Sequence, residues 1–302
     1  MNKIAHRLIE PVQEQFRIIS WNMAGSGSGS DELAAHKIHS LKFWMEHKAY
    51  NNTVAICLQE CGHLYGWSER GRADKELERL MGAELTKMPS GWSLFYFDDG
   101  IKLAKHRSAI LIREPYSAAQ IDKTPDPGVN HRLFGVEFNL FKNRSSFQLF
   151  SIHSPPSLHK TCTSSSEGQL CPYSKKTIES ISTTNASKSI DWMCVGDFNC
   201  LPPAYKDFNP LESTVDVRVR RPGISTTKTR RWSYEEDSRM KMSNEFDYAY
   251  IGGKSLIDSP CRVVVDSVKA SDHQPVHFVF APTKASGAGN YYAKNRVRLE
   301  LD

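Results

Sequence analysis

Several features that would place the chain in a specialised class are absent from its 302 residues. There is no apolar run of about 20 residues, the length that a membrane-spanning helix needs. The first residues, MNKIAHRLIEPVQEQF, lack the apolar stretch of roughly 7–15 residues that a secretory signal carries. No C-x-x-C pair and no internal repeat occur. We therefore expect neither an integral membrane protein nor a zinc-held domain.

The charge excess is small. Lys and Arg number 39 and Asp and Glu 34, which gives a net charge of +5 and a pI near 8.7. This balance suits a polyanionic partner, but it is far from the charge of a histone-like protein. With 39% hydrophobic residues, the chain can bury a large core as one big α/β domain or as two ordinary ones.

Cysteine is sparse, with seven residues, and one pair draws notice. Cys162 and Cys171 bracket the polar segment TSSSEGQL. They could close this loop with a disulfide in an oxidising compartment, or they could remain thiols. Cys57 and Cys194 lie within apolar runs, and we expect them to be buried thiols.

Short segments rich in β-branched and aromatic residues predict many strands. They are residues 16–22, 53–60, 93–97, 108–114, 132–141, 146–154, 191–199, 245–253, 262–268 and 274–280. A Gly/Ser loop and one amphipathic helix, with Asp31 as its cap, lie between the first two. Without strict βαβ alternation, the pattern favours an α/β fold in which two mixed sheets pack together with helices outside. We expect a domain at 16–281 between tails at 1–15 and 282–302.

Polar residues stand where these strands end or begin. They are Asn22, Glu60, His153, Asp197, Asn199, Asp247, Asp272 and His273. Each alone has an ordinary explanation, such as a turn cap, a surface ion pair or a hydrogen-bonded structural histidine. Because strand ends at a sheet edge are where ligands and chemistry collect, the number of segments that share this pattern indicates a site.

The residue types in this set are suited to phosphate chemistry. Asn22, Glu60 and a further carboxylate offer the hard oxygen ligands that Mg²⁺ prefers. An aspartate can orient a water molecule as the nucleophile, and two histidines supply a hydrogen-bond donor and a proton shuttle near neutral pH. The set predicts Mg²⁺-dependent hydrolysis of a phosphoester without a covalent intermediate.

The motifs SWN, LQE, HS, GDFN and SDH, in this order, resemble those of the endonuclease/exonuclease/phosphatase superfamily, which includes DNase I. The resemblance covers about residues 16 to 280. It implies a four-layer fold, a two-sheet sandwich flanked by helices, with the site at one sheet edge. The segments FRIISWNMAGSGSG, LQECG and ASDHQPVHF are similar to those of cytolethal distending toxin B subunits.

The resemblance also implies roles for single residues. Asn22 and Glu60 would bind the metal, with Asp272 close by, and the metal would be Mg²⁺, with Mn²⁺ or Ca²⁺ as alternatives. The catalytic residues would be His153, His273, Asp197 (which orients the water), Asn199 (which supports the phosphate) and Asp247 (which orients His273). Arg107 and Arg132 are similar to arginines that contact substrate phosphate.

The sequence departs from the family pattern at two places. The stretch TKMPSGW, residues 86–92, lacks the glutamate that pairs with the first histidine in DNase I. The partner of His153 is therefore open, with Asp98 or Asp99 as candidates. The segment 157–176, which follows His153, is longer than the corresponding toxin loop, so the shape of the substrate could differ.

The substrate has more than one interpretation. Residues 218–231, RVRRPGISTTKTRR, hold six Lys or Arg and no acidic residue. This run fits a surface that follows a DNA backbone, a nuclear-import signal or a solvated loop. A DNA-nicking endonuclease is the main expectation. The alternatives are a phosphoinositide or inositol phosphate phosphatase and an inactive docking module, although the intact polar set argues against the last.

The toxin resemblance implies partners and a location as well. B subunits travel with delivery subunits, so such partners are expected beside the DNA substrate. A secreted or delivered effector would act in the nucleus of a host cell, and without export the chain would stay in the cytoplasm of its producer.

Overall fold

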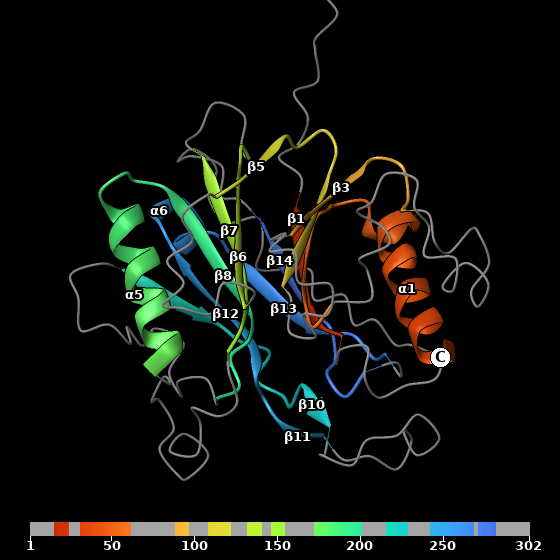
Figure 1. Cartoon of the computed structure of the whole chain (residues 1–302). Coiled ribbons are helices and arrows are strands. Elements are labelled where there is room, and N and C mark those ends of the chain that lie inside the picture. Colours follow the sequence, from red (N-terminus) through yellow and green to blue (C-terminus); the bar gives the residue numbers. More distant parts are fainter. Residues whose placement is uncertain are drawn as a thin grey trace, which may run out of the picture.

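A computed structural model describes residues 15–23, 31–61, 88–96, 108–121, 132–140, 146–154, 172–200, 216–228, 242–268 and 271–281. Two six-stranded sheets pack face to face. Helix α1 (Asp31–Glu46) covers the outer face of one sheet, and helix α5 (Pro172–Ala186) covers the outer face of the other (Figure 1). The two helices and two sheets form four layers, so the fold class expected from the sequence is confirmed.

The first sheet has the strand order β13-β14-β1-β2-β4-β3. Its strands are β1 (Phe16–Asn22), β2 (Thr53–Gln59), β3 (Trp92–Tyr96), β4 (Ala109–Arg113), β13 (Cys261–Val265) and β14 (Val276–Phe280). Only β1 and β2 are parallel, and α1 with a short 3₁₀ turn at Lys48–Tyr50 lies between them in the chain. A crossover helix is the usual connection for parallel neighbours.

The second sheet repeats this plan with the order β5-β6-β7-β8-β12-β9. Its strands are β5 (Ala118–Gln120), β6 (Leu133–Phe138), β7 (Phe147–His153), β8 (Asp191–Asp197), β9 (Val217–Arg220) and β12 (Asp247–Gly252). Its one parallel pair is β7 and β8, and α5 falls between them in the chain. A ribbon of β10 (Thr227–Lys228) and β11 (Met242–Asn244) and the short helix α6 (Lys254–Ile257) complete the described elements.

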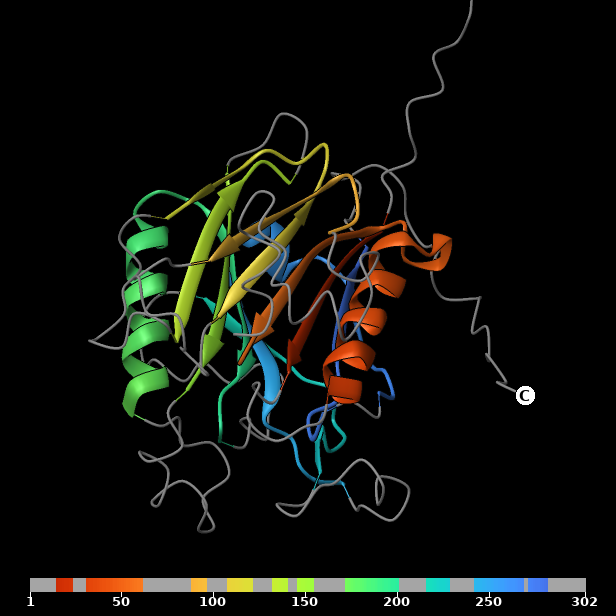
Figure 2. The same ribbon diagram turned by 45° about the vertical axis from the view of Figure 1, so that its right-hand side comes forward.

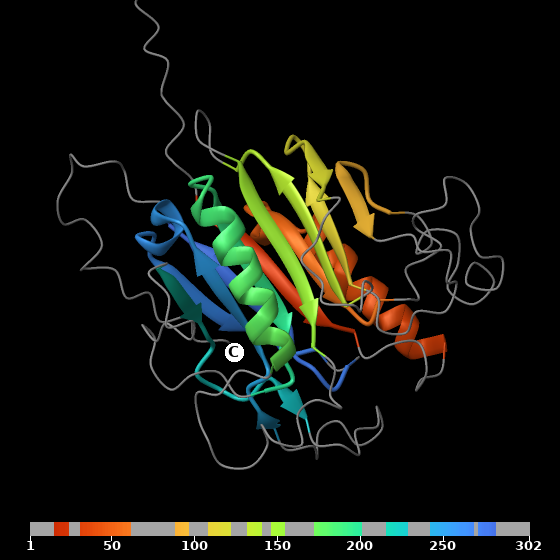
Figure 3. The same cartoon turned by 60° about the vertical axis from the view of Figure 1, so that its left-hand side comes forward.

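Apolar side chains fill three layers. Phe147, Val195 and Phe278 belong to the layer between the sheets. Tyr173, Ile178 and Ile181 of α5 pack against the second sheet in another, and this helix crosses the face of β7 and β8 in Figure 3. Ile38, Leu41 and Trp44 of α1 pack in the third, against the first sheet. Because the central strands are buried on both faces, they read in the sequence as continuous apolar runs.

Each predicted strand overlaps an observed one. The sequence interpretation missed β5, β9, β10 and β11, and it also missed α5, which begins inside the segment taken as an insert. No described helix has the length and apolar character to cross a membrane. Residues 1–14 and 282–302, as well as Cys162 and Cys171, lie outside the described part of the chain. The domain bounds and the disulfide therefore stay predictions.

The two parallel pairs end at one edge of the sandwich. In Figure 2 the arrows of β1 and β2 run toward the side where β10 and β11 lie. Gln59, the last residue of β2, donates from Nε2 to Ser151 Oγ of β7 over 2.9 Å, and Ser151 Oγ donates to Leu58 O over 3.0 Å. These buried hydrogen bonds join the sheets directly behind the residues that follow β2 and end β7.

One buried histidine makes the stability of this fold depend on pH. His277 of β14 packs edge-on against the rings of Trp44 and Tyr50. Burial lowers its pKa to about 4, although the nearby Asp266 carboxylate acts in the opposite direction. An unfolded histidine has a pKa near ~6.5. Below that pH the unfolded chain binds a proton that the folded chain refuses, so stability falls as the pH drops from about 6.5 toward 4.

We predict that His277→Phe, which keeps the ring packing but cannot titrate, removes this contribution. Between pH 7 and pH 5, the wild type should lose about 2 kcal/mol more unfolding free energy than the variant. Urea unfolding at both pH values measures the difference. The same substitution at the exposed His39 is the control and should leave the pH dependence unchanged. Equal pH dependence in the wild type and His277→Phe would contradict the assignment.

Candidate active site

The carboxylate of Asp197 lies at the centre of the edge where both sheets end. Its Oδ1 accepts the backbone N–H of Asn199 at 2.8 Å, and its Oδ2 accepts Asn22 Nδ2 at 2.9 Å and Asn199 Nδ2 at 3.2 Å. The side chain is almost fully buried. Burial raises the pKa of Asp197 to about 7, and Asp247 adds to the rise while His273 and the hydrogen bonds oppose it. A carboxyl group with such a pKa can exchange a proton near neutral pH.

Local backbone geometry lets β8 deliver this carboxylate. Gly196 precedes it with φ +150°, paired with Ile152 of β7. A Cβ at this glycine would lie 2.0 Å from Ile152 O, so no larger residue fits without a shift of the backbone. The next pair in the register is His153 and Asp197. The glycine therefore permits the close strand pairing that sets these two side chains next to each other.

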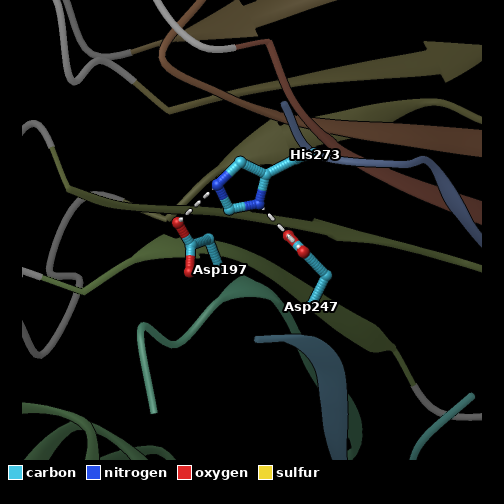
Figure 4. Close-up of side chains that lie close together, drawn as sticks. All are labelled: Asp197, Asp247 and His273. Atoms are coloured by element: carbon cyan, nitrogen blue, oxygen red, sulfur yellow. Dashed lines mark hydrogen bonds and ion pairs between the residues drawn. The ribbon is translucent and has the colours of Figure 1, made fainter. Parts of the chain in front are cut away.

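His273 lies between two carboxylates (Figure 4). Its Nδ1 is 2.9 Å from Asp247 Oδ2, and its Nε2 is 3.7 Å from Asp197 Oδ2. Burial by itself would lower the pKa of His273, but the charges of Asp247 and Asp197 and the hydrogen bond to Asp247 raise it well above the ordinary value. The contact between His273 Nδ1 and Asp247 Oδ2 is the one that the predicted orientation of His273 by Asp247 requires.

The loop that carries His273 is tied to β1. Ser271 Oγ donates to Asn22 O over 2.8 Å and accepts the N–H of His273 at 3.1 Å. Trp21 Nε1 donates to the carbonyl of His273 over 3.2 Å. Residues about 250 positions apart in the chain thus hold the imidazole at the edge.

His153 approaches Asp197 from the other side. Its Nε2 is 3.7 Å from Asp197 Oδ2 and 3.3 Å from Glu60 Oε1. Its Nδ1 lies 3.3 Å from NH1 of Arg132, which also donates to His153 O over 3.4 Å. Because a guanidinium can only donate, this contact favours the tautomer with its proton on Nε2, toward the carboxylates. Arg132 therefore contacts the Nδ1 side of His153, and the partner for which the sequence offered Asp98 or Asp99 stays a prediction, because those two residues lie outside the described part of the chain.

The expected metal donors also converge. Asn22 at the end of β1 and Glu60 just after β2 are linked by a 3.5 Å contact from Nδ2 to Oε1. Burial raises the pKa of Glu60. His273 and the hydrogen bond from Asn22 lower this pKa, whereas the charge of Asp272 raises it further. Two carboxylates and an amide oxygen at a partly buried edge are a donor set that fits Mg²⁺. A cation there would offset the charge that burial disfavours.

A second group of potential metal donors comprises Asp197, Asp247 and His273, whose donor atoms lie within 4.8 Å of one another. In this group, Oδ2 of Asp247 already accepts from His273, and Oδ2 of Asp197 accepts from Asn22. The Oδ2 atoms of Asp247 and Asp197 thus accept from protein donors, and the Glu60 carboxylate has Asn22 Nδ2 and His153 Nε2 among its neighbours. The metal ligands that the motif resemblance implies, Asn22, Glu60 and Asp272, are a different set from this group and stay a prediction.

Two residues of the site have left-handed backbone conformations. Glu60 has φ 52° and Asn199 has φ 50°. Asparagine tolerates this region, but a glutamate there carries strain of order ~1–2 kcal/mol. Asn199 uses its conformation to donate from Nδ2 to Ser154 O over 2.7 Å as well as to Asp197. Strain at two strand ends of one edge is typical of a functional site.

The arginines expected to contact phosphate differ in what the structure shows of them. Arg107 lies outside the described residues, as do Asp98 and Asp99, so their expected roles stay predictions. Arg132 is buried against His153. Of the basic run 218–231, Arg221 forms a forked ion pair with Glu245 (2.6 and 3.1 Å), and Arg220 donates to Ile257 O over 3.1 Å. These two arginines are bound to the protein itself, and residues 229–231 are not described.

Sequence reasoning missed Lys37. It stands on α1 in a helix interpreted only by its apolar stripe, yet its side chain is buried. Burial lowers its pKa to about 8, against the charges of Asp272 and Glu60, which raise it. A basic residue on the helix face that carries Ile38 and Leu41 is the signal that could have found it. Its ammonium group adds positive charge within electrostatic reach of the Asp272 and Glu60 carboxylates.

Comparisons with known proteins agree with this architecture. The chain matches no protein-family model and no curated protein. The cytolethal distending toxin of Haemophilus ducreyi superposes with a TM-score of 0.57 at 18% identity, over 88% of this chain and 98% of the toxin chain. The human Nocturnin catalytic domain gives 0.53 at 14% identity, over 89% and 95%. The endonuclease domain of TRAS1, a telomere-specific retrotransposon, gives 0.52 at 14% identity, over 89% and 100%.

Identities this low show the fold alone. The three solved structures share the two-sheet sandwich of this chain, so the fold that the motif resemblance implied is confirmed.

We predict that Gly196→Ala destabilises the protein by about 3 kcal/mol or more, because the new methyl group meets Ile152 O within the parallel strand pair. Urea unfolding measures the loss. Gly91→Ala is the matched control, since Gly91 also has positive φ (79°) but nothing lies within 4 Å of the added Cβ. It should cost about 1–2 kcal/mol from backbone strain. Equal losses for the two variants would show that crowding at Gly196 is relieved at no cost.

Proposed function

We propose that the protein is a metal-dependent phosphodiesterase that hydrolyses its substrate by direct attack of water. One observation carries the proposal: Oδ2 of Asp197 lies 3.7 Å from Nε2 of both His153 and His273. A carboxylate between two imidazoles can take a proton from water on one side while N–H groups face the phosphate on the other. Ion pairs that serve stability alone do not need two histidines directed at one buried oxygen.

Each side chain has a defined task in this reaction. Asp197 orients the water and accepts its proton, and its pKa of about 7 matches that task. His273, held by Asp247, donates a hydrogen bond or a proton to phosphate oxygens. His153 presents its Nε2 side to the same space. Asn199 fixes Asp197 and, as the motif resemblance implies, supports the phosphate.

The metal would be held by Asn22, Glu60 and Asp272. When bound, Mg²⁺ would neutralise phosphate charge and stabilise the leaving oxygen. Lys37 lies close enough to Glu60 and Asp272 to influence them electrostatically, so the donor set carries less net negative charge than its two carboxylates alone would give. We expect one ion at this edge.

DNA is the substrate we propose, cleaved by nicking as by the toxin B subunits. The motif resemblance supports it, as do the mildly basic chain and the likeness in fold to a toxin and to an endonuclease domain. The basic run 218–231 supports DNA binding less than its composition alone suggests, because Arg220 and Arg221 form bonds within the protein.

The same resemblance extends the proposal to delivery. A chain of the toxin B type would travel with delivery subunits and act on DNA in the nucleus of a host cell.

The substrate test compares supercoiled plasmid with phosphoinositide vesicles, each with Mg²⁺ or with EDTA. We expect nicked circles with Mg²⁺, none with EDTA, and no phosphate release from the vesicles. Asp197→Asn should abolish nicking, whereas Asp216→Asn, on the described chain before β9, should nick at the wild-type rate. Phosphate release without nicking would replace the nuclease with a phosphatase on the same fold. The absence of both activities would overturn the proposal.

We predict that Glu60→Gln loses most of the activity, because the amide removes a charged metal ligand. The variant should also lack the Mg²⁺-dependent rise in Tm that we expect of the wild type, while its Tm without metal stays similar. Glu179→Gln, which removes an exposed carboxylate of α5, is the control and should behave as the wild type. Unchanged turnover at saturating Mg²⁺ would remove Glu60 from the metal site.

A further inference from the structure

Thr226 lies just before β10 in the basic segment, which the sequence alone interpreted as a surface for a DNA backbone, a nuclear-import signal or a solvated loop. Its side chain is fully buried. The hydroxyl donates to Asp247 Oδ2 over 2.8 Å. It also accepts the backbone N–H groups of Phe246 and Asp247, each at 3.2 Å. One donor and two acceptor positions are all that a hydroxyl has, so Thr226 uses its full hydrogen-bonding capacity around Asp247.

The orientation of Asp247 depends on few contacts. Its Oδ2 receives both the Thr226 hydroxyl and Nδ1 of His273. Its Oδ1 is buried and has no hydrogen-bond partner among the described residues. A carboxylate held at a single oxygen can rotate unless the bonds at that oxygen fix it. Without the Thr226 hydroxyl, the only side-chain partner of Asp247 among the described residues would be His273. This is the imidazole whose position Asp247 has to define.

The backbone of Thr226 joins the two segments that bear the pair. Its N–H donates to Asn244 O over 2.7 Å, just ahead of Asp247, and its carbonyl accepts Gln274 N–H at 2.7 Å, just after His273. The forked pair of Arg221 with Glu245, together with the Gly223 N–H bond to Glu245 Oε1 at 2.8 Å, anchors the same loop. The basic segment is thus built in part as a support for the catalytic edge.

We propose that Thr226 is a positioning residue that fixes the Asp247 carboxylate, and through it the His273 imidazole, for phosphodiester hydrolysis. The proposal rests on the proposed function for its effect on rate, but the contact itself is independent of the substrate. Deleting a hydrogen bond to a charged group within a buried pair should lower the rate without changing how substrate is held, since Thr226 is buried behind Asp247.

The test compares Thr226→Val, which replaces the hydroxyl with a methyl group, and Thr226→Ser, which keeps it. We expect kcat on a small phosphodiester or plasmid to fall on the order of tenfold or more in the valine variant, with KM within about twofold. The serine variant should regain most of kcat. Thr177→Val is the control: Thr177 on α5 is equally buried, and its hydroxyl has no partner in the described part of the chain.

A second readout needs neither metal nor substrate. A buried Nδ1–H bonded to a carboxylate gives a slowly exchanging low-field proton signal in NMR, and His273→Gln assigns it by its loss. At a fixed pH, we expect this signal to shift or broaden in Thr226→Val but not in Thr226→Ser or Thr177→Val. If the Tm measurement shows that Thr226→Val does not fold, Thr226→Cys replaces it. The cysteine thiol is close to serine in size but is a weak hydrogen-bond donor, so this variant is compared with Thr226→Ser.

The outcomes separate the two levels of inference. A wild type that hydrolyses no phosphoester removes the proposed function, and the NMR signal still decides whether Thr226 positions His273. An active wild type with wild-type kcat and an unchanged signal in Thr226→Val overturns the positioning role. A loss of Tm in Thr226→Val without a change in kcat or signal also overturns it, since Thr226 would then serve stability alone.

Discussion

The arrangement at the catalytic edge depends on one buried carboxylate that two sheets share. Asp197 ends a strand of the second sheet, yet its Oδ2 accepts from Asn22 of the first. Burial of a carboxylate is costly unless donors surround it. The close pairing at Gly196, the turn at Asn199 and the two imidazoles meet that need together. A raised pKa of Asp197 is the residual consequence, and in the proposed reaction it would suit this group to act as a base.

The need for donors from both sheets around Asp197 is met because the two sheets share one plan. Each sheet has one parallel pair with a helix between its strands in the chain, so each sends two strand ends to the same edge. Each also has an antiparallel neighbour that starts there: β14 follows Asp272 and His273, and β12 begins with Asp247. The hydrogen bond of Gln59 to Ser151 keeps the sheets in register behind the site. The site is therefore a property of the sandwich and of neither sheet alone.

Charged residues at this edge act on each other before they act on a ligand. Arg132 contacts His153, Arg221 pairs with Glu245, and Lys37 lies within electrostatic reach of Asp272 and Glu60. Composition had marked the basic run as a surface for polyanions. In the structure, part of it holds the loop of Thr226 against Asp247. Because a buried ion pair is satisfied internally, counting charges along the chain overstates the charge that a substrate meets.

The sequence by itself determined ten of the fourteen described strands and the two-sheet fold class, and it marked most of the polar residues that gather at the candidate site, because apolar runs and the polar residues that end them are local signals. Only the tertiary structure decided which of these residues touch. The contact of Arg132 with His153, the burial of Lys37, the full use of the Thr226 hydroxyl and the helix at Pro172–Ala186 were not readable from the chain. Contacts between residues 20 to 250 positions apart depend on how two sheets pack, and packing is a property of the whole fold, which no local pattern records.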